Sequence, residues 1–382
     1  MMRVYLDNAA TTPIAPEVVD VMLPILKNEF GNPSSTHFLG RQVKAILENS
    51  RRTISTQLNC QPAEIIFTSG GTEADNMTFH TAIRKLDVQH IITSEIEHHA
   101  VGHTAEFVKE LYPNIIVSYV KLDKNGNVDL TDLENILSNS TVKTLVSLMH
   151  ANNEISTLLD LKKVSELTKK YNAYFHSDTV QTMGHYSFDL QALDIDFITC
   201  SAHKFHGPKG VGFLYVNRKN GVVSMIQGGG QERGFRGGTE NIYGIAGLAK
   251  AIELAYTDLD AHIQHVQGIK NYMIDLLNKN FDDIYFIGET NPEKSLYTVL
   301  NVSFPPTPKA RMLLFTLDLK GICASGGSAC SAGATHGSHV LEGIKADSSR
   351  PNVRFSFSRY TTKEEIDYTV QQLVEIFEKT LA

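Results

Sequence analysis

Asp196-Phe197-Ile198-Thr199-Cys200-Ser201-Ala202-His203-Lys204, followed by Phe205-His206-Gly207-Pro208-Lys209-Gly210, is the segment that decides between the possible folds. Its apolar start predicts a short buried strand, and the turn at Gly207-Pro208 leads into a second apolar run at 212–216. The sites of open α/β sheets lie at the carboxyl ends of the strands, which is where Lys204 stands. A lysine in such a place suits Schiff-base chemistry. Lys209 is the alternative, but we expect its turn to be exposed.

Similar apolar runs precede this segment and alternate with helical patterns. The predicted strands are residues 64–68, 90–93, 115–120, 144–149, 173–176 and 197–200. Amphipathic stretches such as 161–171 lie between several of them. This alternation predicts an α/β fold with a mainly parallel sheet that is covered by helices.

The pattern changes near Thr257. A long helical stretch at 259–281 is followed by strand-like runs at 284–287 and 298–303, a small-residue loop at 324–334 and a last helix at 363–379. We therefore predict a large domain of residues 14–258 and a smaller α+β domain of residues 1–13 and 259–382. Residues 7–13 would form the loop that crosses between the two.

The bulk composition excludes several classes of function. The 382 residues are 42% hydrophobic and 20% charged, with a net charge of -7. A nucleic-acid surface needs clustered basic residues, so direct nucleic-acid binding is not expected. No apolar run is long enough to cross a bilayer, and the first residues lack the apolar core of a signal peptide. Four cysteines do not make a disulfide framework in this length, which indicates free thiols in a reducing cytoplasm.

A glycine pair in Thr68-Ser69-Gly70-Gly71-Thr72 follows a predicted strand and begins a helical pattern. Glycines let a backbone approach a ligand closely, and the free N–H groups of a helix N-terminus suit a phosphate. A plain turn is the alternative interpretation. The segment is neither a Walker loop nor a GxGxxG motif.

Two further segments carry candidate chemistry. A short apolar strand ends at Asp178, which either caps the next helix or holds a pyridine nitrogen protonated. Cys330 lies in a run of Gly, Ser and Ala at 324–334. Such small side chains pack little, so this run suits a thiol that enters a site, takes up a chemical group and carries it away. A linker with an incidental cysteine is the alternative. We interpret the other three cysteines, Cys60, Cys200 and Cys323, as structural.

The histidines give only weak metal patterns. His99 and His103 are spaced i, i+4, and His336 and His339 follow two cysteines. Neither set makes a four-ligand pattern, and no CxxC or HExxH occurs. We therefore predict no dedicated metal site.

Taken in order, these segments resemble the cysteine desulfurases, which are pyridoxal-phosphate (PLP) enzymes of the aspartate-aminotransferase fold, known as fold type I. The likeness covers nearly the whole chain, at 5–12, 31–35, 68–76, 97–98, 149–154, 176–181, 201–210, 228–239, 325–333 and 354–356. Residues 325–330, Ser-Gly-Gly-Ser-Ala-Cys, resemble the motif of one branch of this family. That branch makes persulfide for iron–sulfur clusters and thio-modified tRNA. His99 stands where lysine is common, and Ala202 and Ser358 stand where glycine is common.

The resemblance implies a role for each matching residue. Lys204 would form the Schiff base with PLP, and His98 would stack on the pyridine ring. Asp178 would pair with the ring nitrogen and Gln181 would reach the ring oxygen. Residues implied to hold the phosphate are Gly71, Thr72, Ser201 and His203, together with Thr239 of a neighbouring subunit, which implies a homodimer. Asn153 would lie beside cofactor and substrate, and Arg354 would bind the substrate carboxylate.

The implied reaction takes sulfur from L-cysteine onto Cys330 and leaves L-alanine. The persulfide would pass to a sulfur-acceptor protein, either an iron–sulfur scaffold or a tRNA-thiolation enzyme. One alternative is a selenocysteine lyase or another fold type I aminotransferase-like enzyme, which would share the cofactor residues without needing Cys330. A scaffold that has lost its chemistry is a second alternative, and the presence of Lys204, Asp178 and Cys330 argues against it.

Overall fold

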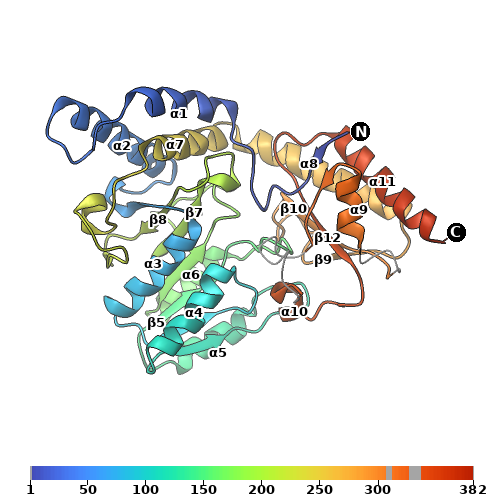
Figure 1. Cartoon of the computed structure of the whole chain (residues 1–382). Coiled ribbons are helices and arrows are strands. Elements are labelled where there is room, and N and C mark those ends of the chain that lie inside the picture. The colour runs from blue at the N-terminus through green and yellow to red at the C-terminus, as the bar shows by residue number, and fades with distance from the viewer. Residues whose placement is uncertain (1, 307–311, 327–336, 382) are drawn as a thin grey trace.

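A seven-stranded sheet forms the centre of the larger part of the molecule (Figure 1). The computed structural model describes residues 2–306, 312–326 and 337–381. The strands are β2 (Ile65–Thr68), β3 (His90–Thr93), β4 (Ile116–Tyr119), β5 (Thr144–Ser147), β6 (Tyr174–Asp178), β7 (Phe197–Ser201) and β8 (Gly212–Val216). Their order is β2-β8-β7-β6-β5-β3-β4, and within the described sheet only β8 runs antiparallel to its neighbours. The predicted mainly parallel sheet is confirmed.

Helices cover both faces of this sheet because its strands are apolar on both sides. Ile66 faces a core formed with α3 (Gly71–Arg84) and α4 (His99–Leu111), whereas Ile65 and Phe67 face the opposite core. That second core is formed with α1 (Pro16–Asn28), α2 (Phe38–Gln57), α5 (Leu130–Asn139), α6 (Leu161–Lys170) and α7 (Ile242–Thr257). Alternate residues of one strand thus enter different cores, as the period of two requires.

The C-terminal third has a separate core, which it shares with the first residues of the chain. The strands β12 (Asn352–Ser356), β10 (Val299–Ser303) and β9 (Tyr285–Ile287) form an antiparallel sheet in that order. Strand β1 (Val4–Tyr5) pairs with β11 (Ile322–Cys323), and Val4 and Leu6 join the core of this region. The helices here are α8 (Leu259–Asn280), α9 (Leu313–Leu319), α10 (His339–Gly343) and α11 (Lys363–Leu381).

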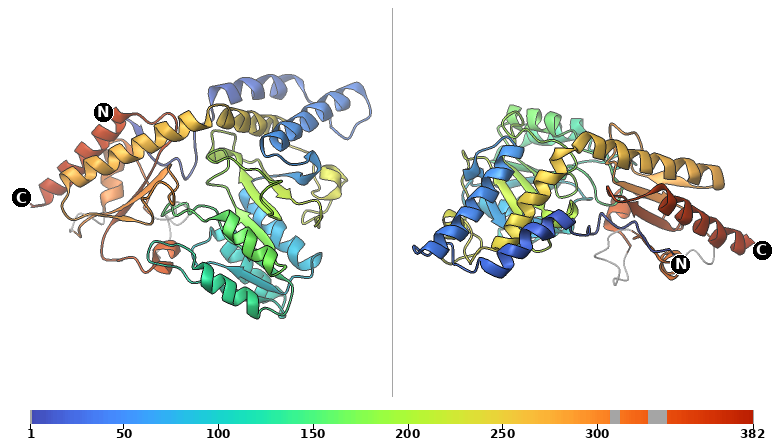
Figure 2. Two further views of the ribbon diagram at one scale, coloured as in Figure 1. Left: turned by 180° about the vertical axis from the view of Figure 1, so that it is seen from behind. Right: turned by 90° about the horizontal axis from the view of Figure 1, so that it is seen from above.

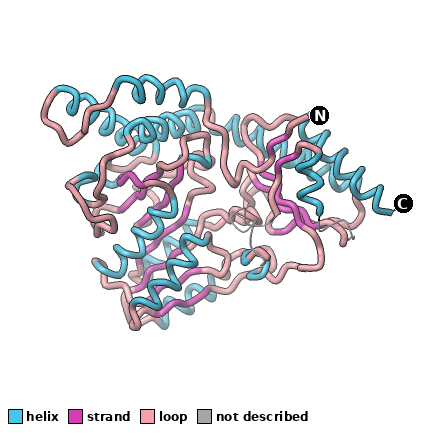
Figure 3. Tube along the Cα trace, viewed as in Figure 1, coloured by secondary structure: helices cyan, strands magenta, loops and turns pink. Residues whose placement is uncertain are grey.

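Figures 2 and 3 show these two packed regions side by side, with α8 running from one to the other and loops filling the space between the two sheets. The separate cores support the proposed division into residues 14–258 and residues 1–13 with 259–382, which stays a prediction in its boundaries. None of the described helices is long and apolar enough to span a membrane.

Candidate active site

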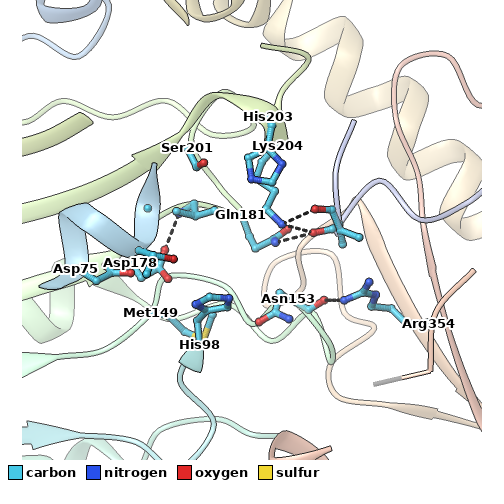
Figure 4. Close-up of a pocket in the computed structure, with 15 residues that line it drawn as sticks. Asp75, His98, Met149, Asn153, Asp178, Gln181, Ser201, His203, Lys204 and Arg354 are labelled. Carbon is cyan, nitrogen blue, oxygen red and sulfur yellow. Dashed lines mark hydrogen bonds between the residues drawn. The ribbon is translucent and has the colours of Figure 1, made fainter. Parts of the chain in front are cut away.

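A cavity of about 250 Å³ lies at the carboxyl ends of β6 and β7, beside the first turn of α3 (Figure 4). Ten residues that the sequence singled out line it: Gly71, Thr72, His98, Asn153, Asp178, Gln181, Ser201, His203, Lys204 and Arg354. Five further residues complete the lining: Ala9, Ala10, Asp75, Met149 and Val180. Exposed Thr239 is not among the described residues that line the cavity. Cys330 lies outside the described residues.

One end of the cavity is built from glycine backbone and hydroxyl groups. Gly70 has a φ of +153°, and a Cβ at Gly71 would lie 2.7 Å from Val180 Cγ2, so only glycine fits at Gly71 without a shift. The peptide N–H groups of the first turn of α3 have no partners within the helix, and they lie beside the Ser201 and Thr72 side chains. This donor set suits an anion such as a phosphate.

His203 adds a neutral imidazole to the same end. Its Nδ1 lies 3.1 Å from Thr11 Oγ1. Burial, followed by the charge of Lys204, lowers the pKa of His203 to about 4. The ring is therefore uncharged at neutral pH and acts as a hydrogen-bonding group.

A buried carboxylate pair forms the floor of the cavity. Asp178 ends β6 and accepts a hydrogen bond from Val180 N at 2.9 Å. Burial and then the neighbouring Asp75 raise the pKa of Asp178 to about 6, and burial raises the pKa of Asp75 to about 7. Ligand atoms of Asp75, His98 and Asp178 lie within 4.8 Å of one another. A cationic or N–H partner, such as a protonated pyridine ring, would stabilise the ionised form of these buried carboxyl groups.

Sequence reasoning missed Asp75, although it belongs to the quoted segment 68–76. Its position four residues after Gly71 places it one helical turn further along the same face of α3. That spacing is the signal that could have identified it.

His98, the N-cap of α4, lies beside Asp75 and Asp178. Its Nδ1 accepts a hydrogen bond from Ala100 N at 3.1 Å, which leaves the proton of the neutral ring on Nε2. Burial is the main cause that lowers the pKa of His98. The imidazole is therefore held in one orientation, and it can accept a proton only on Nδ1, once the hydrogen bond from Ala100 N is released.

Lys204 ends the short helical turn η2 (Ala202–Lys204), directly after β7. Its Nζ donates to Ala9 O at 2.6 Å and to Ala10 O at 2.9 Å, and Gln181 Nε2 donates to Ala9 O at 3.1 Å (Figure 4). The predicted crossing loop of the first dozen residues thus forms one wall of the cavity. Lys209 is exposed, as predicted.

Arg354 enters the cavity from β12, on the side opposite Asp178 (Figure 4). It is 1% exposed, and its guanidinium donates to Asn153 O at 3.0 Å and to Asp7 Oδ1 at 2.8 Å. Its Nε has no hydrogen-bond partner among the described residues. A planar fork of this kind binds carboxylates in two-point fashion. Sequence reasoning missed the partner Asp7, since 347 residues separate the two.

Of the three cysteines that the structure describes, Cys200 is buried, Cys60 is half-buried and Cys323 is exposed. Burial raises the pKa of all three thiols. The interpretation of the three cysteines as structural stays a prediction, which the exposure of Cys323 does not support. In the β1–β11 pair, Val4 and Ile322 point into the core, so their neighbours Tyr5 and Cys323 point outward.

Comparison with known proteins agrees with this geometry. The family model Aminotransferase class-V matches residues 4–369. "Cysteine desulfurase IscS" of Dictyoglomus turgidum is 42% identical over 381 residues, which cover 99% of this chain and 95% of that protein. "Putative cysteine desulfurase IscS 1" of Bacillus subtilis is 38% identical, with 99% and 100% covered.

Solved structures show the same likeness. A structure named "NIFS-LIKE PROTEIN" superposes with a TM-score of 0.90 at 35% identity, covering 99% of this chain and 100% of that one. "SspA in complex with cysteine" superposes with a TM-score of 0.81 at 29% identity, covering 94% and 99%. The fold, the cavity and these matches over the full length together place the chain in the cysteine desulfurase family of PLP-dependent class-V aminotransferases.

Proposed function

We propose that this chain transfers sulfur from L-cysteine to Cys330, releases L-alanine and passes the persulfide sulfur to an acceptor protein. The observation that carries the proposal is the meeting of Lys204, Asp178 and Arg354 in one cavity. These residues supply an amine, a buried carboxylate and a carboxylate-binding fork. A PLP enzyme acting on an amino acid needs all three groups.

The residues present fit PLP. The first turn of α3, with Gly71, Thr72, Ser201 and His203, would hold the phosphate. Asp178 would hold the ring nitrogen protonated, Gln181 would reach the ring oxygen and His98 would cover the ring. Bound PLP supplies an electron sink, which weakens the bonds at the Cα atom of an amino acid.

The protein's own groups then divide the work. Arg354 binds the substrate carboxylate and so orients the amino acid beside Asn153. Lys204 would move a proton from the substrate Cα, while the carbonyls of Ala9 and Ala10 hold its amine at the cavity wall. His98, uncharged at neutral pH because burial lowers its pKa, would take the proton of the reacting thiol on Nδ1, which first has to release its hydrogen bond from Ala100 N.

Sulfur transfer itself needs no external oxidant. The Sγ atom of Cys330 bonds to the substrate sulfur, and the substrate Cβ–S bond breaks. The electron pair of that bond stays on Cβ, which gains a proton and becomes the methyl group of alanine. The acceptor protein then takes the outer sulfur. It would be an iron–sulfur scaffold or a tRNA-thiolation enzyme.

A second copy of the chain would complete the site. Val19, Leu23 and Leu26 lie at i, i+4 and i+7 on α1 and are 44%, 44% and 61% exposed. Phe30, just after α1, and Phe38, at the start of α2, are also exposed. A homodimer that covers these side chains would also let exposed Thr239 serve the partner's phosphate site.

The test is incubation with L-cysteine and a thiol reductant, with sulfide and alanine measured together. The wild type should release the two in equal amounts. Cys330→Ser should keep the visible colour of bound cofactor, yet form no protein persulfide and almost no sulfide. Cys323→Ser is the matched control, since it removes an exposed thiol seven residues earlier. Alanine release by Cys330→Ser at the wild-type rate would favour a thiol-independent lyase instead.

A further inference from the structure

The described ends of the segment that contains Cys330 are hydrogen-bonded to a cavity residue on one side and to neighbours of cavity residues on the other. Before it, Ser325 pairs through its main chain with Arg354, with Arg354 N donating to Ser325 O at 2.6 Å. After it, Ser338 Oγ donates to Glu154 Oε2 at 2.5 Å, and His339 Nε2 lies 2.8 Å from Glu97 O. Glu154 directly follows Asn153, and Glu97 directly precedes His98.

Glu154 is held firmly at its main chain. Its N–H donates to Asn152 Oδ1 at 2.8 Å, and its carbonyl accepts from Asn301 Nδ2 at 3.1 Å. Its side chain is fully buried. Burial raises the pKa of Glu154, while the Ser338 hydrogen bond and the charges of Arg354 and His339 lower it.

One oxygen of this carboxyl, Oε1, has no hydrogen-bond partner within the described part of the chain. A buried carboxyl with an unpartnered oxygen costs folding free energy that an apolar side chain would not. The residue type therefore needs a reason other than packing, and the bond from Ser338 is the one hydrogen bond that the structure describes for this side chain.

Helix α10, which begins after Ser338, lies apart from α9 and α11 in Figure 1 and packs against loops of the large sheet and against Ile287 of β9. Val340 and Ile344 form a small core with Ile96 and Ile155. The His339 ring contacts that of His99 with centroids 4.3 Å apart. These contacts fix the chain just after the Cys330 segment to the stretches that carry His98 and Asn153.

We propose that Glu154 is a positioning residue, whose hydrogen bond with Ser338 fixes the end of the Cys330 segment to the substrate side of the cavity. Through this bond it sets how often the Cys330 thiol meets the substrate sulfur. Glu154 itself touches neither substrate nor cofactor. The inference rests on the proposed function, because it concerns the transfer step alone.

Ser338 has two roles that substitutions can separate. Its Oγ donates to Glu154 and also accepts from Leu341 N at 3.2 Å as the N-cap of α10. Ser338→Asp keeps a good N-cap but cannot donate to a carboxylate, so it exchanges the hydrogen bond to Glu154 for an unfavourable contact between two carboxyl groups. Ser338→Thr keeps both roles.

The experiment uses the PLP-loaded enzyme and two readouts. The change in visible absorbance on titration with L-cysteine gives substrate affinity, and intact mass after a single turnover gives the rate of persulfide formation. Ser338→Asp and Glu154→Ala should slow persulfide formation about tenfold, the size expected for loss of a hydrogen bond to a charged group. Cysteine affinity should stay within about twofold of the wild type. Glu154→Gln, a weaker acceptor, should lie between, and Ser338→Thr should match the wild type.

Ser349→Ala is the matched control, because Ser349 Oγ also donates to a carboxylate, Asp347 Oδ1, but on the exposed turn after α10. It should leave both readouts unchanged. The inference is overturned if Ser338→Asp forms persulfide at the wild-type rate, or if cysteine affinity falls as much as the transfer rate. The second result would indicate a merely structural role.

Should Glu154→Ala fail to fold, the comparison of Ser338→Asp with Ser338→Thr decides the matter. The double variant Glu154→Gln/Ser338→Asp should be no slower than Ser338→Asp, since both changes remove one contact. A larger loss in the double variant would contradict a single shared bond. If the wild type forms no persulfide on Cys330 at all, the proposed function fails, whatever the variants at Glu154 and Ser338 do.

Discussion

Arg354 Nη2 and Asp7 Oδ1 lie 2.8 Å apart, so an ion pair joins β12 to the N-terminal segment at the edge of the cavity. Arg354→Lys keeps the charge but loses the planar fork that binds a carboxylate at two points. We expect kcat/KM for L-cysteine to fall roughly 30-fold or more, equivalent to about 2 kcal/mol, the low end for a broken charged pair at a binding site. Steady-state kinetics measure this.

Arg350→Lys is the control, because Arg350 forms a similar pair with Asp283 at 3.1 Å away from the cavity. Its kinetics should match the wild type. An unchanged kcat/KM in Arg354→Lys would remove Arg354 from substrate binding.

Lys204→Ala should abolish both activity and the visible absorbance of lysine-bound PLP. The reason is the position of Nζ, which the carbonyls of Ala9 and Ala10 hold inside the cavity. Lys209→Ala removes an exposed lysine in the following turn and should leave the spectrum intact. A normal visible band in Lys204→Ala together with its loss in Lys209→Ala would reverse the assignment.

Gly71→Ala should weaken PLP binding. The added Cβ would lie 2.7 Å from Val180 Cγ2, and accommodating it would shift the cavity wall beside Asp178. Overpacking of this kind costs about 1–3 kcal/mol, so titration of the cofactor-free protein should give a Kd roughly 5- to 150-fold higher. Gly102→Ala in α4 is the control, because its Cβ would enter open space. Equal affinities for Gly71→Ala and wild type would show that the α3 turn is not the phosphate site.

The sequence predicted the strands well because each is a short apolar run bounded by turn residues. In the large sheet the errors are confined to strand ends, whereas the two-residue strands β1 and β11 were not predicted. Residues 144–149 were expected as one strand, but β5 ends at Ser147, since the N–H of Met149 donates to the carboxylate of Glu97 and not to a neighbouring strand. No local pattern encodes that contact, which joins residues 52 positions apart.

The sequence predicted those site residues that belong to local motifs. It did not predict those whose role depends on tertiary contacts. Glycine before a helix and a lysine after a strand have local physical reasons, so Gly71 and Lys204 could be found. Asp7, Asp75 and Glu154 matter because of what the fold brings beside them. Burial of a polar side chain in such places cannot be read from the residues next to it.

Asp75 should make the stability of the cofactor-free protein depend on pH. Burial raises its pKa to about 7, from an ordinary value near 4, so the folded state binds a proton that the unfolded state has released. That contribution is complete below about pH 4 and is lost as the pH rises towards 7. Asp75→Asn removes this contribution. Between pH 5 and pH 8, the free energy of unfolding of the variant should therefore rise by about 2–3 kcal/mol relative to that of the wild type.

Urea unfolding at the two pH values measures this difference. Buried histidines such as His150 and His185, whose pKa values burial lowers, act in the opposite direction in both proteins and cancel in the comparison. A difference that does not change with pH would mean that Asp75 is ionised in the folded chain throughout.

Mixing an inactive Lys204→Ala chain with an impaired Thr239→Ala chain should restore activity if Thr239 serves the partner's site. In a hybrid of Lys204→Ala and Thr239→Ala chains, one site combines the intact Lys204 of one chain with the intact Thr239 of the other, whereas the second site carries both defects. Random pairing of equal amounts makes half of the dimers hybrid, so about a quarter of all sites should be intact. Activity after subunit exchange, with the residual activity of Thr239→Ala subtracted, should approach that fraction of the wild-type value. If Thr239 acted within its own chain, no hybrid site would be complete and mixing would restore nothing. Sedimentation that finds an active monomer at assay concentration would contradict the dimer itself.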